Sequence, residues 1–243
     1  VSVNHETVFA DNRIGDGGGM TAFRIDRVAD SIVVVPQTLS DGRSGEFFNV
    51  DFVNTVGETG MHRGGISSMV DGRIWTAEEW FRGNMSSIFQ GQNIDSPESN
   101  DDWPKTPAGL RDGQGVRDTS DFTISSDITA FDGYTVRKNE NFNWMVEIDP
   151  KEAVAIRKQY NWGRQPFEGG VVAMDNKTVY LGPDTRGWPF SKFVADEAGD
   201  FTSGKLYVYK HDLAEKWVEV DNTDPQKMLN FLDAAYEAGA TMY

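Results

Sequence analysis

Residues 170–181 read GVVAMDNKTVYL and predict a β-hairpin. Two runs rich in β-branched and apolar residues flank Asp175-Asn176, and such a pair is a two-residue turn signal. Similar short runs on both sides of this hairpin are also expected to be strands: residues 1–6, 21–26, 31–36, 73–77, 142–149, 191–195, 205–210 and 216–220. Many short strands with Gly-rich turns indicate an all-β fold, which is a sandwich, a barrel or a propeller. No internal repeat chooses among the three.

Three segments interrupt the strand pattern. Residues 84–126 are rich in Gly, Asp, Ser, Asn and Pro, so we expect a long insertion loop within a single domain that covers residues 1–243. Residues 223–239 predict a helix that Asp224 can cap and Gly239 can end. We expect its apolar stripe to lack a covering element, so that the chain is an internal part of a longer protein. Residues 151–160 have helical composition but also fit a connection between strands.

The composition excludes several classes of function. The chain has 243 residues and a formal net charge of −15, which disfavours nucleic acid as a partner because phosphate contacts need Lys and Arg. It has no cysteine, so disulfides, thiolate zinc sites and cysteine nucleophiles are excluded. It also has no apolar run of about 18 residues, the length that a membrane-spanning helix needs. Neither a Walker-type loop nor a G-x-S-x-G nucleophile elbow occurs.

Four short motifs contain the candidate functional residues. They are Asn4-His5-Glu6, residues 57–80 with His62, Glu78 and Glu79, residues 163–170 with Arg164 and Glu168, and residues 182–192 with Asp184. The adjacent carboxylates Glu78 and Glu79 repel each other unless a cation lies near them. The Arg164 guanidinium suits a bidentate contact with phosphate or carboxylate. Taken singly, each motif also fits an ordinary structural role, such as a solvated strand end or an Arg–Glu ion pair.

Taken in order, these motifs resemble the PhoX-type alkaline phosphatase family. Residues 76–81 (TAEEWF) are similar to the family's T-C-E-E-N-F, and residues 163–168 (GRQPFE) to its G-R-F-x-H-E. Residues 180–194 (YLGPDTRGWPFSKFV) resemble Y-M-G-D-D-x-R followed by Y-K-F-V. The similarity includes residues 3–6 (VNHE), 64–65 (GG), 144–150 (WMVEIDP) and 234–242 (AAYEAGATM), and thus extends over nearly the whole chain.

The resemblance implies a β-propeller that is exported to the periplasm or the extracellular space and hydrolyses small phosphate esters. It implies a cluster of Ca²⁺ and Fe³⁺ at the open end of the propeller, which activates an oxygen nucleophile without a covalent phosphoserine. Such cations would also offset the acidity of the chain. The expected metal ligands are Glu6, His62, Glu78, Glu79, Glu168 and Asp184, and the expected catalytic residues are Arg164 and Glu168. In particular, Glu6, Glu78 and Glu168 are expected to share one ion.

The chain departs from the family pattern at four positions. His62 replaces a cysteine iron ligand, and Arg63 replaces a small residue. Ala77 replaces a second cysteine, and Phe167 replaces a histidine. Imidazole also binds iron, but without the thiolate the expectation of iron is weaker than that of calcium. Two alternatives therefore stay open: a non-catalytic, calcium-stabilised propeller that serves as an extracellular binding or structural protein, and a propeller hydrolase of another kind, such as a lactonase or a phytase-like enzyme.

Overall fold

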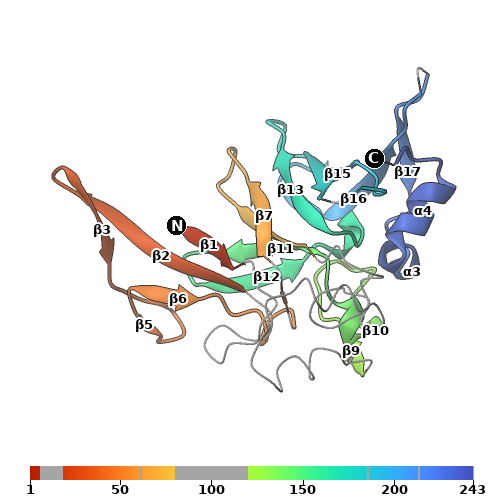
Figure 1. Ribbon diagram of the computed structural model, residues 1–243. Coiled ribbons are helices and arrows are strands. Elements are labelled where there is room, and N and C mark those ends of the chain that lie inside the picture. The colour runs from red at the N-terminus through yellow and green to blue at the C-terminus, as the bar shows by residue number, and fades with distance from the viewer. Residues whose placement is uncertain are drawn as a thin grey trace, which may run out of the picture.

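Antiparallel strands form the framework of the computed structural model (Figure 1). The structure describes residues 1–5, 19–57, 59–60, 62–79, 120–184, 186–212 and 214–242. The strands of these residues belong to five separate sheets, none of which closes into a ring within the described ranges. The expected all-β class is therefore confirmed. The expected propeller is not shown by the described residues.

The first sheet carries a long hairpin that projects from the body of the molecule (Figure 1). Its strands are β1 (Ser2–His5), β2 (Gly19–Val28), β3 (Ser31–Val35) and β6 (Phe47–Asn49), and β2 pairs with the other three. A small ribbon of β4 (Gln37–Thr38) and β5 (Ser44–Gly45) lies between β3 and β6 in the sequence. The expected strands at residues 21–26 and 31–36 thus form, and β2 is longer than expected.

The central sheet has the strand order β12 (Val154–Lys158), β11 (Met145–Asp149), β8 (Ile74–Glu78) and β7 (His62–Ser67). For residues 151–160 the sequence allowed either a helix or a connection between strands. The structure has β12 there, followed by the 3-10 helix η2 (Tyr160–Trp162), so the second alternative is correct. Beside this sheet lie a ribbon of β9 (Asp121–Thr123) and β10 (Thr135–Arg137) and the 3-10 helix η1 (Lys138–Glu140). Residues 84–119, which are most of the expected insertion, lie outside the described residues.

The third sheet is a meander in sequence order: β13 (Phe167–Val172), β14 (Thr178–Pro183), β15 (Ser191–Glu197), β16 (Asp200–Tyr209) and β17 (Trp217–Val220). The hairpin around Asp175-Asn176 is confirmed, but residues 173–177 connect its strands, a longer loop than the expected two-residue turn. The Asp175 carboxylate accepts hydrogen bonds from the backbone N–H groups of Lys177 and Thr178, both at 2.9 Å. Asn176 adopts the left-handed conformation with a φ of 52°, which Asn tolerates better than most residues.

The C-terminal helix is shorter than expected and is broken in the middle. It consists of α3 (Pro225–Leu229) and α4 (Phe231–Glu237), because Asn230 leaves the helical region with φ −104° and ψ 43°. Asp224 caps α3 by accepting from the N–H of Gln226 at 2.9 Å. Phe231 in α4 is fully buried in the core, so the expectation of an uncovered apolar stripe was wrong. Within the described chain, no helix is long and apolar enough to cross a membrane.

Two hydrophobic cores hold the three larger sheets together. The larger core lies between the central and the third sheet and contains the aromatic side chains of Trp75, Trp162, Phe193 and Phe201. The smaller core joins the first and central sheets. In this arrangement β13 of the third sheet packs along β7 of the central sheet, and this contact positions the candidate site.

Candidate metal centre

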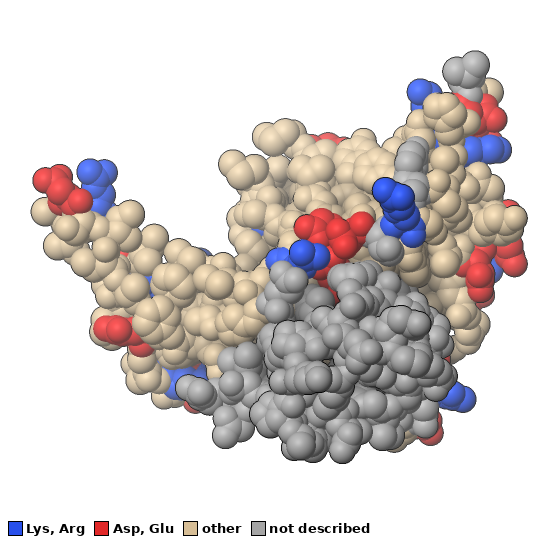
Figure 2. Space-filling view, in the orientation of Figure 1, with Lys and Arg blue, Asp and Glu red and all other residues tan. Residues whose placement is uncertain are grey.

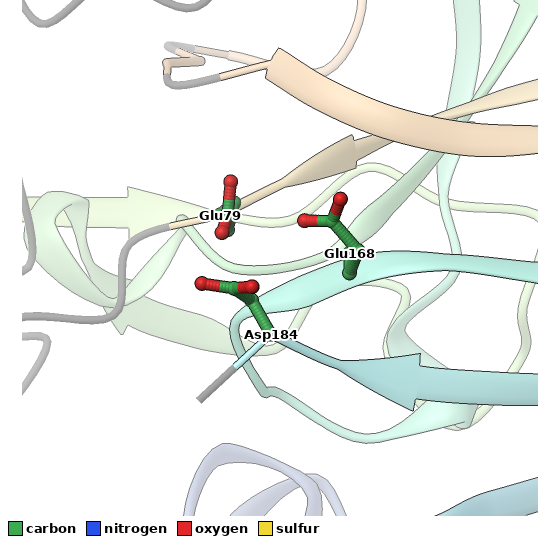
Figure 3. A group of neighbouring side chains, drawn as sticks. All are labelled: Glu79, Glu168 and Asp184. Carbon is green, nitrogen blue, oxygen red and sulfur yellow. The ribbon is translucent and has the colours of Figure 1, made fainter. Parts of the chain in front are cut away.

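Three carboxylates from separate strand ends meet at one point of the molecule (Figure 3). Glu79 directly follows β8, Glu168 is the second residue of β13, and Asp184 directly follows β14. One carboxylate oxygen from each side chain lies within 4.8 Å of the other two. We call Glu79, Glu168 and Asp184 the carboxylate centre.

Glycines in β7 and β13 allow the two sheets to approach closely enough to form this centre. A Cβ on Gly64 would lie only 1.5 Å from the carbonyl oxygen of Glu168, so no other residue fits there without moving β13. A Cβ on Gly169 would contact Gly65 in turn. The pairing of β13 with β14 also shifts register between Phe167 and Gly169, and such an irregularity redirects the side chain at the bulge, here Glu168.

The Glu79 carboxylate is the buried member of the centre, whereas Glu168 and Asp184 are exposed. Among the described residues, no N–H or O–H donor contacts its Oε2 atom. Burial, and next a hydrogen bond with the Asp184 carboxyl, raise the pKa of Glu79 to about 9. A buried anion beside a second anion is costly unless a cation compensates it. The orphaned Oε2 and the all-oxygen donor set therefore fit a hard divalent cation such as Ca²⁺.

The guanidinium of Arg63 faces the carboxylate centre. Its Nη1 atom lies 2.9 Å from Glu79 Oε1 and 3.9 Å from Asp184 Oδ2. Figure 2 shows acidic side chains gathered near the middle of this face with basic side chains beside them. Sequence reasoning recorded Arg63 only as a departure from the family pattern. Its position beside the Gly64-Gly65 pair was the available signal, because that pair marks a close approach of another strand.

Asn4 holds the strand segment that carries Arg63. Its side-chain amide donates to the carbonyl oxygens of Arg63 and Gly64, the latter at 2.8 Å, and its Oδ1 accepts from the Thr76 hydroxyl at 2.9 Å. Asn4 was recognised as part of a motif at the end of the first strand, but without this role. Glu6, the expected ligand two residues later, lies outside the described residues.

Glu78 and His62 lie in a separate buried network. Glu78 Oε1 accepts from Lys158 Nζ at 2.9 Å and from the Thr59 hydroxyl at 2.5 Å, and Glu78 Oε2 accepts from the N–H of Trp144 at 3.0 Å. His62 is the strand partner of Glu78, and its ring nitrogens contact the hydroxyls of Thr59 and Thr76 at 2.5 and 2.8 Å.

The charges of this network follow from its burial. Burial, and then the charge of Lys158, lower the pKa of His62 to about 3, so its ring is neutral at ordinary pH. Burial also raises the pKa of Glu78, and Lys158 opposes that shift. The metal-ligand roles of His62 and Glu78 stay predictions, and the contacts of both side chains are to this network rather than to the carboxylate centre.

Arg164 is buried in the loop between η2 and β13. Only 7% of the residue is exposed, and its Nε donates to the carbonyl oxygen of Phe142 at 2.9 Å. Burial lowers the pKa of Arg164 to about 10, partly offset by the charges of Glu140 and Glu78. Its guanidinium remains charged at neutral pH, and the predicted contact with phosphate stays a prediction.

Three comparisons with known proteins bear on this architecture. A family model described as "Alkaline phosphatase PhoX" matches residues 72–242, which is more than half of the chain. A solved structure, Pseudomonas fluorescens PhoX in complex with vanadate, a transition state analogue, shares the fold with a TM-score of 0.53 at 18% sequence identity. That match covers 93% of this chain but only 46% of the solved one. A search of curated proteins found no significant match.

A β-rich chain whose sheets gather carboxylates at their strand ends is thus matched by a phosphatase family over most of its length. The chain belongs to the alkaline phosphatase PhoX family. It spans less than half the length of the solved Pseudomonas fluorescens protein.

Proposed function

We propose that this chain is part of a metal-dependent phosphomonoesterase whose metal binds at the carboxylate centre. The single observation that carries the proposal is the convergence of Glu79, Glu168 and Asp184, with Glu79 buried and its Oε2 without a partner. Family membership supplies the reaction class, the hydrolysis of small phosphate esters. The same resemblance favours a propeller formed with further parts of the chain and a location in the periplasm or outside the cell.

The three carboxylates would hold Ca²⁺, which prefers six to eight oxygen ligands and tolerates irregular geometry. When bound, the ion would clamp phosphate oxygens and offset negative charge at the site. Glu79 would supply the buried, fixed ligand. Glu168 is exposed, and an exposed carboxylate beside a bound ion could accept a proton from an attacking water. The expected Fe³⁺ rests on His62, whose ring nitrogens are engaged with two threonines.

Arg164 is proposed to orient the substrate through its planar guanidinium. What supports this role is its position four residues before Glu168 on the loop that leads into β13, together with a charge that persists at neutral pH. The family comparison covers the same region. The contact that Arg164 makes with Phe142 O fixes Nε and thereby the plane of the fork.

Steady-state hydrolysis of para-nitrophenyl phosphate by the whole natural protein tests the proposal. Loss of groups that only support metal ligands costs about 10–100-fold, so Glu79→Gln and Asp184→Asn should each lower kcat/KM by at least about 100-fold. Glu237→Gln is the matched control, because Glu237 is an exposed carboxylate at the end of α4. Chelation should abolish the activity of the wild-type protein, and added Ca²⁺ should restore it.

Two results would count against the proposal. An inactive wild-type protein that nonetheless binds Ca²⁺ would favour a non-catalytic calcium-binding role. Equal activity of Glu79→Gln and Glu237→Gln would show that the carboxylate centre takes no part in the reaction.

A further inference from the structure

The Arg63 guanidinium already occupies part of the carboxylate centre. Among the described residues, Arg63 is the only Lys or Arg that forms an ion pair with Glu79 or Asp184. Its Nη1 atom donates to Glu79 Oε1 at 2.9 Å. Its side chain is 37% exposed, whereas that of Glu79 is fully buried. The contact therefore brings an intrinsic cation to the carboxylate that a metal would also need.

The backbone at Arg63 is fixed, whereas its side chain is partly exposed. Asn4 donates to the carbonyl oxygens of Arg63 and Gly64, which ties this part of β7 to β1. The long side chain runs from this anchor to the surface, and arginine keeps its charged end hydrated when it can reach solvent. The proposal below therefore assigns the release from Glu79 to the side chain of Arg63, while Asn4 holds the strand.

A guanidinium and a divalent cation cannot both use Glu79 fully. Ca²⁺ binds carboxylates through one oxygen or both, at about 2.3–2.6 Å, and a bidentate Glu79 would need the Oε1 atom that Arg63 Nη1 contacts at 2.9 Å. Two cations on adjoining oxygens of one buried carboxylate repel each other strongly, because the local dielectric constant is low. Asp184 Oδ2, at 3.9 Å from Arg63 Nη1, is subject to the same conflict.

We propose that Arg63 is an internal competitor of the metal, holding Glu79 and Asp184 in the metal-free protein and leaving Glu79 when a divalent cation binds. The proposal rests on the metal centre proposed above and adds that this chain sets the affinity of that centre through its own guanidinium. It also gives the buried Glu79 carboxyl a polar partner before any metal is present.

Isothermal titration of Ca²⁺ into the chelator-stripped whole protein tests the proposal. Arg63→Gln should bind Ca²⁺ about 10-fold more tightly than the wild type. This magnitude lies between the small contribution of an exposed ion pair and the large contribution of a buried one, because only one partner of this pair is buried. Arg63→Lys, which keeps the charge, should stay near the wild type. Arg186→Gln is the matched control, because it removes the same charge from the loop that follows Asp184. Arg186 forms no ion pair with the carboxylate centre in the described structure, so the Ca²⁺ affinity of this variant should equal that of the wild type.

Thermal unfolding gives a readout that a merely structural role of Arg63 would not produce. In chelator, Arg63→Gln should melt at a lower temperature than the wild type, because its carboxylates have lost their counter-cation. In saturating Ca²⁺ this deficit should shrink or reverse. A wild-type crystal structure with Ca²⁺ supplies a measurement that needs no variant, and there Arg63 Nη1 should no longer lie within 4 Å of Glu79 Oε1.

The outcomes separate this proposal from the proposed function. Ca²⁺ binding to Arg63→Gln that is equal to or weaker than wild-type binding would overturn the competitor role and leave the metal centre intact. An unchanged Arg63–Glu79 contact in the calcium-bound crystal would do the same. If the wild-type protein binds no Ca²⁺ at all, the metal centre and the competitor role fail together.

Discussion

Glu78 and Glu79 are adjacent in the sequence but have different surroundings. Successive side chains of a strand point to opposite faces, so the end of β8 sends Glu78 to Lys158 and Glu79 to Arg63. The adjacent pair did signal a nearby cation, as expected from the sequence. It signals two cations, however, one for each face, and both are supplied by side chains of this protein.

The ion pair between Lys158 and Glu78 is fully buried on both sides, with 2.9 Å between Nζ and Oε1. Removing one partner of such a pair leaves a buried charge uncompensated. We expect Lys158→Met to lower the free energy of unfolding by about 3–5 kcal/mol, measured by urea denaturation. Lys205→Met is the matched control, because the Lys205–Glu219 pair has the same 2.9 Å separation but is about half exposed. Its loss should have a much smaller effect than that of Lys158, because exposed ion pairs contribute little to stability.

The effect of Lys158→Met should depend on pH in a defined direction. Burial raises the pKa of Glu78 in the folded state, and loss of the lysine raises it further. A carboxyl with a raised folded-state pKa loses stability as pH rises through the window between its unfolded and folded pKa values. The variant should therefore be less impaired near pH 5, close to the unfolded pKa of Glu at about 4.3, than near pH 8, well above it. The double variant Lys158→Met/Glu78→Gln should recover most of the loss, and equal costs for the buried and exposed pairs would refute this account.

At the scale of elements, the packing of β13 along β7 decides whether the carboxylate centre exists. A Cβ at Gly64 would overlap the Glu168 carbonyl oxygen at 1.5 Å, and a backbone atom cannot move aside as a flexible side chain can. We expect Gly64→Ala to cost about 3 kcal/mol or more, the upper range for overpacking, and to weaken Ca²⁺ binding because Glu168 is displaced from Glu79.

Gly45→Ala in β5 provides the control for this substitution. A Cβ there would meet nothing closer than 4.0 Å, so both the melting temperature and the Ca²⁺ affinity should stay near wild-type values. If Gly64→Ala melts like Gly45→Ala and binds Ca²⁺ equally well, the close contact between the two strands does not shape the centre.

Local features of these elements were predictable from the sequence, whereas contacts between distant elements were not. The Asp175-Asn176 turn follows from residues that are adjacent in the chain, as do most strands. The contact of Gly64 with Glu168 joins positions about a hundred residues apart, and the Gly64-Gly65 pair indicates only that something approaches. The break of the C-terminal helix at Asn230 was missed because the apolar stripe continues through it. Met228 and Phe231 lie on either side of the break and both pack in the larger core, a tertiary contact that the local sequence does not reveal.

At the scale of the whole molecule, the net charge of −15 favours the binding of cations. The carboxylate centre places part of this charge where the central and third sheets meet. The family model places the chain in the alkaline phosphatase PhoX family, and the solved Pseudomonas fluorescens PhoX shares its fold. The family predicted from the sequence is therefore confirmed, whereas the assignment of residues to the site stays a prediction, for Glu79, Glu168 and Asp184 as well as for Glu6, His62, Glu78 and Arg164.

An ion that bridges β8, β13 and β14 should stabilise the whole fold, because it binds the native arrangement and not the unfolded chain. At a free Ca²⁺ concentration of about 100 times the Kd, this linkage contributes about 2.7 kcal/mol. For a domain of this size, each kcal/mol shifts the melting temperature by about 2–4 °C. Excess chelator should therefore lower the melting temperature of the wild-type protein by roughly 5–10 °C, as measured by scanning calorimetry. The Glu79→Gln variant, which lacks the buried ligand, should show little response to chelator or to Ca²⁺. If the wild type and this variant respond equally, the stabilising ion lies elsewhere in the protein, and superimposable wild-type curves with and without chelator would show that no such ion stabilises the fold.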